Sequence, residues 1–165
     1  MRAFLYRAAA VAVVILILDE LLKSIARSSL KICSVSPITN CDRLELVGPL
    51  LLVRTANAGS ALGFRQGLWI WVVLAAVGIL LIPIYARWLG WSNWSAALAV
   101  GLQLGGAMAN LLDRIVFGGA SDVFYVGGAY TWNLADIALA AGTLLATWAL
   151  LRTRVAKHSA RAAST

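Results

Sequence analysis

The segment from Trp132 to Arg152 reads WNLADIALAAGTLLATWALLR, with one acidic residue, Asp136, in a run that is otherwise largely apolar. Its length is close to the roughly 20 residues that a helix needs to cross the hydrocarbon core of a bilayer. A carboxylate at membrane depth costs a few kcal/mol and usually marks chemistry or transport. Asp136 lies about four residues into this helix, or only ~6 Å below the nearer boundary. We therefore expect a transmembrane helix whose carboxylate meets water near one membrane surface.

Three further stretches are similarly apolar, over about residues 8–26, 68–87 and 95–116. The chain of 165 residues is 61% hydrophobic and 13% charged, with a mean hydropathy of +0.84, a composition that ordinary soluble domains do not show. Aromatic residues stand at the ends of the last three stretches, as in the interfacial belts of membrane proteins. The pattern predicts a membrane all-α protein, a bundle of four transmembrane helices.

The basic residues predict how these helices cross the membrane. Lysine and arginine flank the start of the first stretch and the ends of the second and fourth, and such residues favour the cytoplasmic side. Both termini should therefore be cytoplasmic, with all seven acidic residues on the outer side or in the outer half of the membrane. The net charge of +7 reflects this topology and not nucleic-acid binding, because no basic stripe is interleaved with aromatic residues.

The first stretch has an alternative interpretation as a cleaved signal sequence. Basic residues precede its apolar run, and Ser24-Ile25-Ala26 loosely resembles a cleavage site. The charged residues Asp19, Glu20 and Lys23 would interrupt the region before the cut, so we favour a membrane span.

The outer segment 27–67 is too long for a simple connection. Residues 44–64 within it carry Gly48-Pro49, a run of leucine and valine, and Asn57-Ala58-Gly59. These features predict a small extracytoplasmic β-sheet between helices 1 and 2 that rests on the membrane surface. Asn57 and Gly59 suit a tight turn or a positive φ, and taken alone an ordinary hairpin turn would explain them.

Cys33 and Cys41 lie in the same outer segment, in a compartment that permits oxidation. A disulfide and two free thiols both remain open, since spacing alone does not show that the Cβ atoms meet. No metal site is expected, because the only histidine, His158, falls in the cytoplasmic tail. We expect no cofactor.

Polar residues recur at helical spacing near the outer ends of two spans. Asp19 and Lys23 stand at i and i+4, where opposite charges share a face, and a structural salt bridge is the default interpretation. Asn110 and Arg114 share a face in the same way, and an amide with a guanidinium can donate to the carbonyls of a bound peptide. Asp113 is expected to anchor its helix end.

Five short motifs follow one another along the chain: Asp19-x-x-x-Lys23, Asn57-x-Gly59-x-Ala61-x-Gly63, Gly106-Ala107-x-x-Asn110-x-x-Asp113-Arg114, Asp122-x-Phe124 and Asn133-x-Ala135-Asp136. In this order and topology they resemble the lipoprotein signal peptidase, or type II signal peptidase, family. The resemblance extends from the first motif to the last, and the set is specific where any one motif would not be.

The resemblance implies an intramembrane aspartic endopeptidase with four transmembrane helices. Such an enzyme removes signal peptides from bacterial prolipoproteins by cutting N-terminal to the diacylglyceryl-modified cysteine. Carried over motif by motif, Asp122 and Asp136 are the implied catalytic dyad. The implied substrate-binding residues are Asn57, Gly59, Asn110, Arg114 and Asn133, and the implied structural supports are Asp19, Lys23 and Asp113.

The chain departs from the usual family pattern at four positions, Leu62, Ala109, Val123 and Trp132. None of these changes removes a polar group, but they put the usual shape of the pocket in doubt. The segment around the two cysteines is not explained by the resemblance.

Two neighbouring carboxylates can activate water without any metal. They cannot easily both ionise within hydrogen-bonding range, so one keeps a proton near neutral pH. The ionised member takes a proton from water, the water attacks the scissile carbonyl, and the protonated member donates to the oxyanion or the leaving amine. The sequence leaves open which aspartate starts charged.

The main alternative is a small proton-coupled transporter or channel subunit, in which intramembrane carboxylates form a relay. A relay needs ionisable groups in both halves of the membrane, yet the inner halves of the predicted spans lack acids. A structural membrane subunit would leave the two aspartates without purpose. A peptidase that pairs Lys23 with Ser60 or Ser121 is a further alternative, weakened because Lys23 already has Asp19 one turn away.

We therefore predict one integral-membrane peptidase domain over residues 1–152 and a basic, flexible cytoplasmic tail over residues 153–165. The protein should be a multi-pass monomer of the bacterial plasma (inner) membrane, with its active site near the outer leaflet. Its expected partners are lipid-modified prolipoproteins and membrane lipid, and no nucleic acid.

Overall fold

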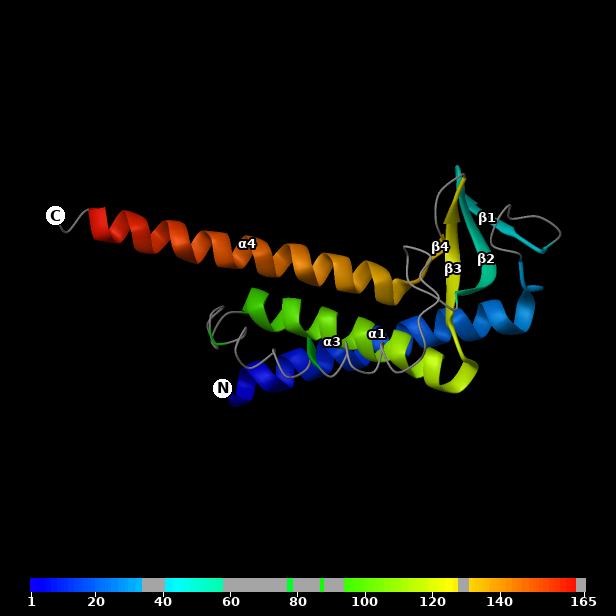
Figure 1. Cartoon of the computed structure of the whole chain (residues 1–165), viewed down its shortest axis with the longest axis horizontal. Coiled ribbons are helices and arrows are strands. Elements are labelled where there is room, and N and C mark those ends of the chain that lie inside the picture. The colour runs from blue at the N-terminus through cyan, green and yellow to red at the C-terminus, as the bar shows by residue number, and fades with distance from the viewer. Residues whose placement is uncertain (34–40, 58–76, 79–86, 88–93, 128–130, 163–165) are drawn as a thin grey trace.

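The computed structural model describes residues 1–33, 41–57, 77–78, 87, 94–127 and 131–162. Its helices are α1 (Arg2–Ser29), α3 (Trp94–Phe117) and α4 (Leu134–Ala162), and its strands are β1 (Leu44–Val47), β2 (Leu50–Asn57), β3 (Ala120–Val126) and β4 (Thr131–Trp132). The sheet stands at one end of the helices, and the start of α1 and the end of α4 lie toward the other end (Figure 1). Both ends therefore lie on one side of the fold, while their cytoplasmic position stays a prediction.

Helix α3 packs against both α1 and α4, and glycines set how closely it does so. A Cβ atom at Gly101 or Gly105 would lie within 2.7 Å of a backbone oxygen of α1. A Cβ atom at Gly142 of α4 would lie 2.8 Å from the Ala99 carbonyl oxygen, and one at Gly106 would collide with the carbonyl of Ala135. These small residues let the helix backbones approach, as is usual where lipid removes the hydrophobic drive between helices.

Two described helices are long and apolar enough to cross a membrane, α3 and the part of α4 from Leu134 to Arg152. They coincide with the predicted spans 95–116 and 132–152. The first predicted span, 8–26, lies within the continuous helix α1. The second, 68–87, lies outside the described residues except at positions 77, 78 and 87. The count of four transmembrane helices therefore stays a prediction.

Helix α4 continues beyond its predicted end. Its backbone is helical to Ala162, through most of the segment 153–165 that we expected to be a flexible tail. The helix-favouring alanines, arginines and lysine of this segment explain the extension.

The sheet is antiparallel, in the order β1-β2-β3-β4. Its first two strands lie in the segment where a sheet was predicted. The sheet extends beyond the predicted segment between helices 1 and 2, because β3 and β4 come from the segment between α3 and α4. Asp122 is a residue of β3, whose Val123-Phe124-Tyr125-Val126 is rich in strand-forming side chains.

Two glycines with positive φ turn the chain at the borders of these elements. Gly48, at φ 54°, joins β1 to β2 where Gly48-Pro49 predicted a turn. Gly118, at φ 75°, follows α3, and its N–H donates to the Arg114 carbonyl at 3.1 Å. A left-handed residue at this place ends the helix and allows β3 to begin two residues later.

Cys33 and Cys41 form a disulfide, with their Cα atoms 4.9 Å apart. Of the two alternatives that the sequence left open, the structure has the bridged form. The disulfide joins the chain leaving α1 to the chain entering β1.

We predict that Gly106→Ala destabilises the protein, because its methyl group would collide with the Ala135 carbonyl and force α3 and α4 apart. The expected loss is about 1–3 kcal/mol in the free energy of unfolding, measured by thermal unfolding in detergent. Gly127→Ala is the control, since no described atom lies within 4 Å of its added Cβ. Equal unfolding temperatures for the two variants would contradict the close helix approach.

Candidate active site

Asp122 projects from β3 with both carboxylate oxygens hydrogen-bonded. Its Oδ2 accepts from Asn57 Nδ2 at 3.2 Å and from Thr131 Oγ1 at 2.8 Å. Its Oδ1 accepts from Asn133 Nδ2 at 3.1 Å. Only 1% of the residue is exposed. Strands β2 and β4, which flank β3, thus supply donors to a buried carboxylate.

Asp136 lies in the first turn of α4 and forms a reciprocal cap with Asn133. The Asp136 N–H donates to Asn133 Oδ1 at 2.9 Å, and the Asn133 N–H donates back to Asp136 Oδ2 at 3.3 Å. This is the geometry of a capping box, in which an acid three residues past the cap reaches back to it. The other carboxylate oxygen of Asp136, Oδ1, accepts a hydrogen bond from Asn110 Nδ2 of α3 at 2.8 Å.

Asn133 connects the two acids. Besides Asp122, its Nδ2 group reaches the Oδ1 atom of Asn110 at 3.0 Å, and the side chain is fully buried. Asp122 and Asp136 therefore lie on either side of one amide, one from a strand and one from a helix. The structure thus brings together both acids and three of the asparagines that the motifs singled out.

A buried cation lies beneath this network. Lys23 Nζ is 2.6 Å from Asp19 Oδ2 and 3.0 Å from Asp113 Oδ2, and all three side chains are 0% exposed. The ammonium also donates to Asn110 Oδ1 at 3.3 Å. The predicted pairing of Asp19 with Lys23 is confirmed, and Asp113 completes the cluster from α3.

The two carboxylates of this cluster hold the backbone beside each acid. Asp113 Oδ2 accepts from the Ser121 N–H at 2.7 Å, and Asp19 Oδ1 accepts from the Ala135 N–H at 2.9 Å. Ser121 and Ala135 are the residues that directly precede Asp122 and Asp136. Asp19 thereby also satisfies one of the amides left open at the start of α4.

Comparison with known proteins then identifies the family. A family model described as signal peptidase (SPase) II matches residues 11–152. The chain belongs to the signal peptidase II family. It is 33% identical to the lipoprotein signal peptidase of Polynucleobacter necessarius subsp. necessarius, covering 94% of this chain and 95% of the relative. It is 34% identical to the lipoprotein signal peptidase of Teredinibacter turnerae, covering 90% and 89%.

Two solved structures share the fold of this protein. Both are described as bacterial membrane enzymes determined by the in meso method. The first, at 2.3 Å resolution, has a TM-score of 0.74 at 22% identity, covering 88% of this chain and 87% of the other. The second, at 1.9 Å, has a TM-score of 0.70 at 23% identity, covering 87% and 92%. The apolar helices of this chain agree with the description of both solved proteins as membrane enzymes.

Burial raises the pKa of the Asp122 carboxyl to about 6. The hydrogen bond from Thr131 opposes the rise, because it favours the ionised form, and the nearby Asp136 carboxylate adds to it. Donation from Asn57 and the positive charge of Lys23 lower the pKa by smaller amounts.

Three of the predicted substrate-binding residues need separate comment. Arg114 is half-buried, and its Nη1 group donates to the Asn110 carbonyl at 2.9 Å, so the two share a helix face as predicted. Asn57 is the last residue of β2, which pairs with β3 up to that residue, and the turn expected beyond it lies outside the described residues. Gly59 lies outside the described residues.

Two residues of the site were missed at the sequence level. Thr131 bonds Asp122 directly, and Arg27 donates to Asp113 Oδ1 at 3.0 Å and to Ser121 Oγ at 3.2 Å. The signal for Arg27 was available, since it lies one turn beyond Lys23 on the same helix face. Thr131 had no such signal, because its partner depends on how two strands pair.

The serine–lysine alternative is disfavoured by the surroundings of Lys23. Its ammonium is engaged by two carboxylates, whereas a base for serine must be neutral. The Ser121 hydroxyl accepts from Arg27, and Ser60 lies outside the described residues. Within the described ranges, no group of three or more His, Cys, Asp or Glu side chains is placed to hold a metal ion.

We predict that Lys23→Met strongly destabilises the protein, because it leaves Asp19 and Asp113 buried without their shared cation. The expected loss is about 3–5 kcal/mol in the free energy of unfolding, by thermal unfolding in detergent. Lys31→Met, at an exposed lysine just beyond α1, is the matched control. Adding Asp19→Asn to Lys23→Met should recover part of the loss, and a Lys23→Met protein as stable as the control would contradict the assignment.

Proposed function

We propose that this protein is an intramembrane aspartic endopeptidase that removes signal peptides from bacterial prolipoproteins. It cuts N-terminal to the diacylglyceryl-modified cysteine, with Asp122 and Asp136 as the catalytic dyad. The observation that carries the proposal is the position of both carboxylates around the single amide of Asn133. Membership of the family and the names of its curated relatives supply the substrate class.

In the proposed mechanism, Asp122 holds the shared proton, as its raised pKa favours. Asp136, which is half-buried, acts as the base in this proposal. It takes a proton from water as the water oxygen bonds to the scissile carbonyl carbon, while Asp122 donates its proton to the carbonyl oxygen. Collapse of the tetrahedral intermediate returns a proton to Asp122 and breaks the C–N bond, and the leaving amine receives the proton held by Asp136.

The polar residues around the dyad bind the substrate in this proposal. The amides of Asn57, Asn110 and Asn133 and the guanidinium of Arg114 supply donors suited to peptide carbonyls and to the developing oxyanion. Gly59 is proposed to complete this set. Asn133 also lies between the two acids and forms hydrogen bonds with both. The site is therefore already organised before the substrate binds.

The membrane contributes to the proposed reaction in two ways. Apolar surroundings lower the local dielectric, which favours a shared proton and strengthens donors aimed at the oxyanion. A substrate anchored by its own acyl chains arrives concentrated and oriented. We place the enzyme as a monomer in the bacterial plasma membrane, with both termini cytoplasmic and the site near the outer leaflet.

The transporter alternative gains no support from the arrangement of charges. All seven acidic residues lie in the second half of α1, near or in the sheet, at the end of α3 or at the start of α4. These positions gather at the sheet end of the molecule (Figure 1). A proton relay would need acids toward the opposite end as well.

We predict that Asp122→Asn and Asp136→Asn each reduce cleavage of a diacylglyceryl-modified prolipoprotein by at least about a thousandfold, because an amide can neither accept nor donate the transferred proton. Cleavage is measured in detergent or lipid, with thermal unfolding as the check that the protein is folded. Glu45→Gln, at an exposed acid of β1, should retain activity. Substantial cleavage by either aspartate variant would refute the dyad, and proton flux in liposomes that Asp136→Asn abolishes would favour a transporter.

We predict that kcat/KM falls as pH rises through an apparent pKa near 6, where Asp122 loses its proton. Thr131→Val removes a donor to the ionised carboxylate, so the Asp122 pKa should rise and the falling limb should move to higher pH by roughly half to one unit. Thr147→Val is the matched control, because its hydroxyl donates only within α4, to Thr143 O. A limb that stays in place or moves to lower pH would contradict the assigned roles.

A further inference from the structure

The chain leaving α1 is tied to the sheet by a covalent bond and by hydrogen bonds. Cys33 is bridged to Cys41, and its N–H donates to the Arg54 carbonyl of β2 at 2.7 Å. Arg54 in turn donates from Nη1 to the carbonyls of Arg27 at 2.9 Å and Leu30 at 3.3 Å. We call Cys33, Cys41 and Arg54 the clasp. Through them the end of α1 and strand β2 hold each other at three points.

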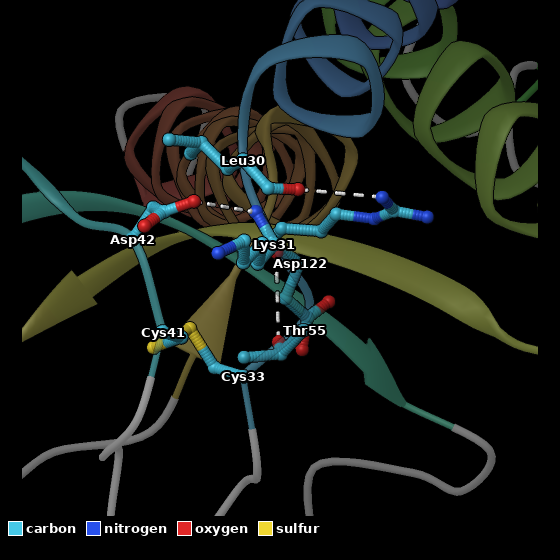
Figure 2. Close-up of a disulfide and its surroundings, with 8 residues drawn as sticks. Leu30, Lys31, Cys33, Cys41, Asp42, Thr55 and Asp122 are labelled. Carbon is cyan, nitrogen blue, oxygen red and sulfur yellow. Dashed lines mark hydrogen bonds between the residues drawn. A yellow bond between two sulfur atoms is a disulfide. The ribbon is translucent and has the colours of Figure 1, made fainter.

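A further hydrogen bond joins the chain leaving α1 to the chain entering β1, from the Lys31 N–H to Asp42 Oδ2 at 3.2 Å. Figure 2 shows the disulfide together with this hydrogen bond and with Thr55, whose hydroxyl donates to the Asp122 carbonyl. The clasp therefore lies within one strand of the acid that we propose to be catalytic.

Strand β2 contains a bulge next to Arg54, the residue of the clasp that belongs to this strand. Leu52 pairs with Phe124 and Thr55 pairs with Asp122, so β2 advances three residues while β3 advances two. The extra residue falls at positions 53–54, in the part of β2 that includes Arg54. Bulges of this kind bend a strand and redirect the side chains that follow, and they recur beside active sites.

The bulge determines which side chains of β2 reach Asp122. A shift of one residue turns every later side chain of a strand to the other face. With the bulge in place, the Thr55 hydroxyl donates to the Asp122 carbonyl at 3.5 Å, and Asn57 Nδ2 reaches Asp122 Oδ2 at 3.2 Å. Without the bulge, Arg54 would pair with Asp122 across the two strands, and Asn57 would no longer be placed to donate to the Asp122 carboxylate.

We propose that the clasp is a positioning device for catalysis: Cys33, Cys41 and Arg54 hold the bulge in β2 that keeps Asn57 on Asp122. The proposal rests on the proposed function in taking Asp122 as a member of the dyad. The clasp itself does not touch the reacting atoms, and it acts through the register of β2 against β3.

The test compares the Cys33→Ala/Cys41→Ala variant with wild type in the presence and absence of dithiothreitol. The reagent breaks the disulfide by delivering two electrons and two protons, which yields two thiols and the cyclic oxidised reagent. The reduced wild type and the alanine variant should both lose about three- to tenfold in kcat, as expected for a small displacement of a catalytic group. Dithiothreitol should have no further effect on the alanine variant.

The pH profile separates positioning from stability. If Asn57 no longer donates to Asp122, the Asp122 pKa rises and the falling limb of kcat/KM moves to higher pH. The charged groups that bear on Asp122 are Asp136 of α4, Lys23 of α1 and Arg114 of α3, and the clasp variants leave all three unchanged.

Two single variants complete the design. Arg54→Met removes both donations to the end of α1 and should reproduce the loss in kcat and the shifted limb. Phe4→Leu is the control, because Phe4 is buried near the opposite end of α1. It should lower the unfolding temperature while leaving the falling limb unchanged.

The proposal is overturned if the alanine variant, the reduced wild type and Arg54→Met keep the kcat and pH profile of the oxidised wild type, even if they unfold at a lower temperature. In that case, with Asp122→Asn inactive, only the positioning role fails. If Asp122→Asn itself cleaves the substrate, the proposed function fails whatever the clasp variants do.

Discussion

The ammonium of Lys23 is the charge on which the rest of the site depends. It is fully buried between the carboxylates of Asp19 and Asp113, which come from two different helices. Two buried carboxylates without a cation would be too costly to keep ionised, so the ammonium makes their presence possible. Their oxygens also accept hydrogen bonds from the backbone N–H groups of Ala135 and Ser121. One cation thereby supports the backbone beside both proposed catalytic acids.

The amides of Asn110 and Asn133 connect the Lys23 cluster to the two proposed catalytic acids. Asn110 accepts from Lys23 and donates to Asp136, so it joins the structural cation to one acid. Asn133 begins α4 and reaches across to Asp122, so it joins the helix to the sheet. The position of each acid is therefore determined by groups that are themselves buried and bonded. Such preorganisation is what strengthens electrostatic catalysis in a site of low dielectric.

Much of this arrangement could be predicted from spacing within one segment. The i and i+4 positions of Asp19 and Lys23 predicted their ion pair, and the hydropathy predicted the spans now seen in α3 and α4. The segment beginning Trp132-Asn133-Leu134-Ala135-Asp136 was expected to open a helix, and α4 begins at Leu134. By contrast, β3, the Thr131 hydrogen bond and the contacts of Arg27 were missed. Each of these depends on partners that are distant in sequence or on how neighbouring strands pair.

The amino-acid sequence by itself determined the family, the apolar spans and the identity of the polar side chains, because periodicity and short motifs are local properties of the chain. The tertiary structure alone decided that Asp122 belongs to a strand, that the two cysteines are bridged and that a bulge aligns Asn57 with its acid. Contacts such as the one from Ala135 to Asp19 join residues 116 positions apart. No local pattern specifies them, because they exist only once helices and sheet have packed and excluded the solvent that would otherwise bind the same groups.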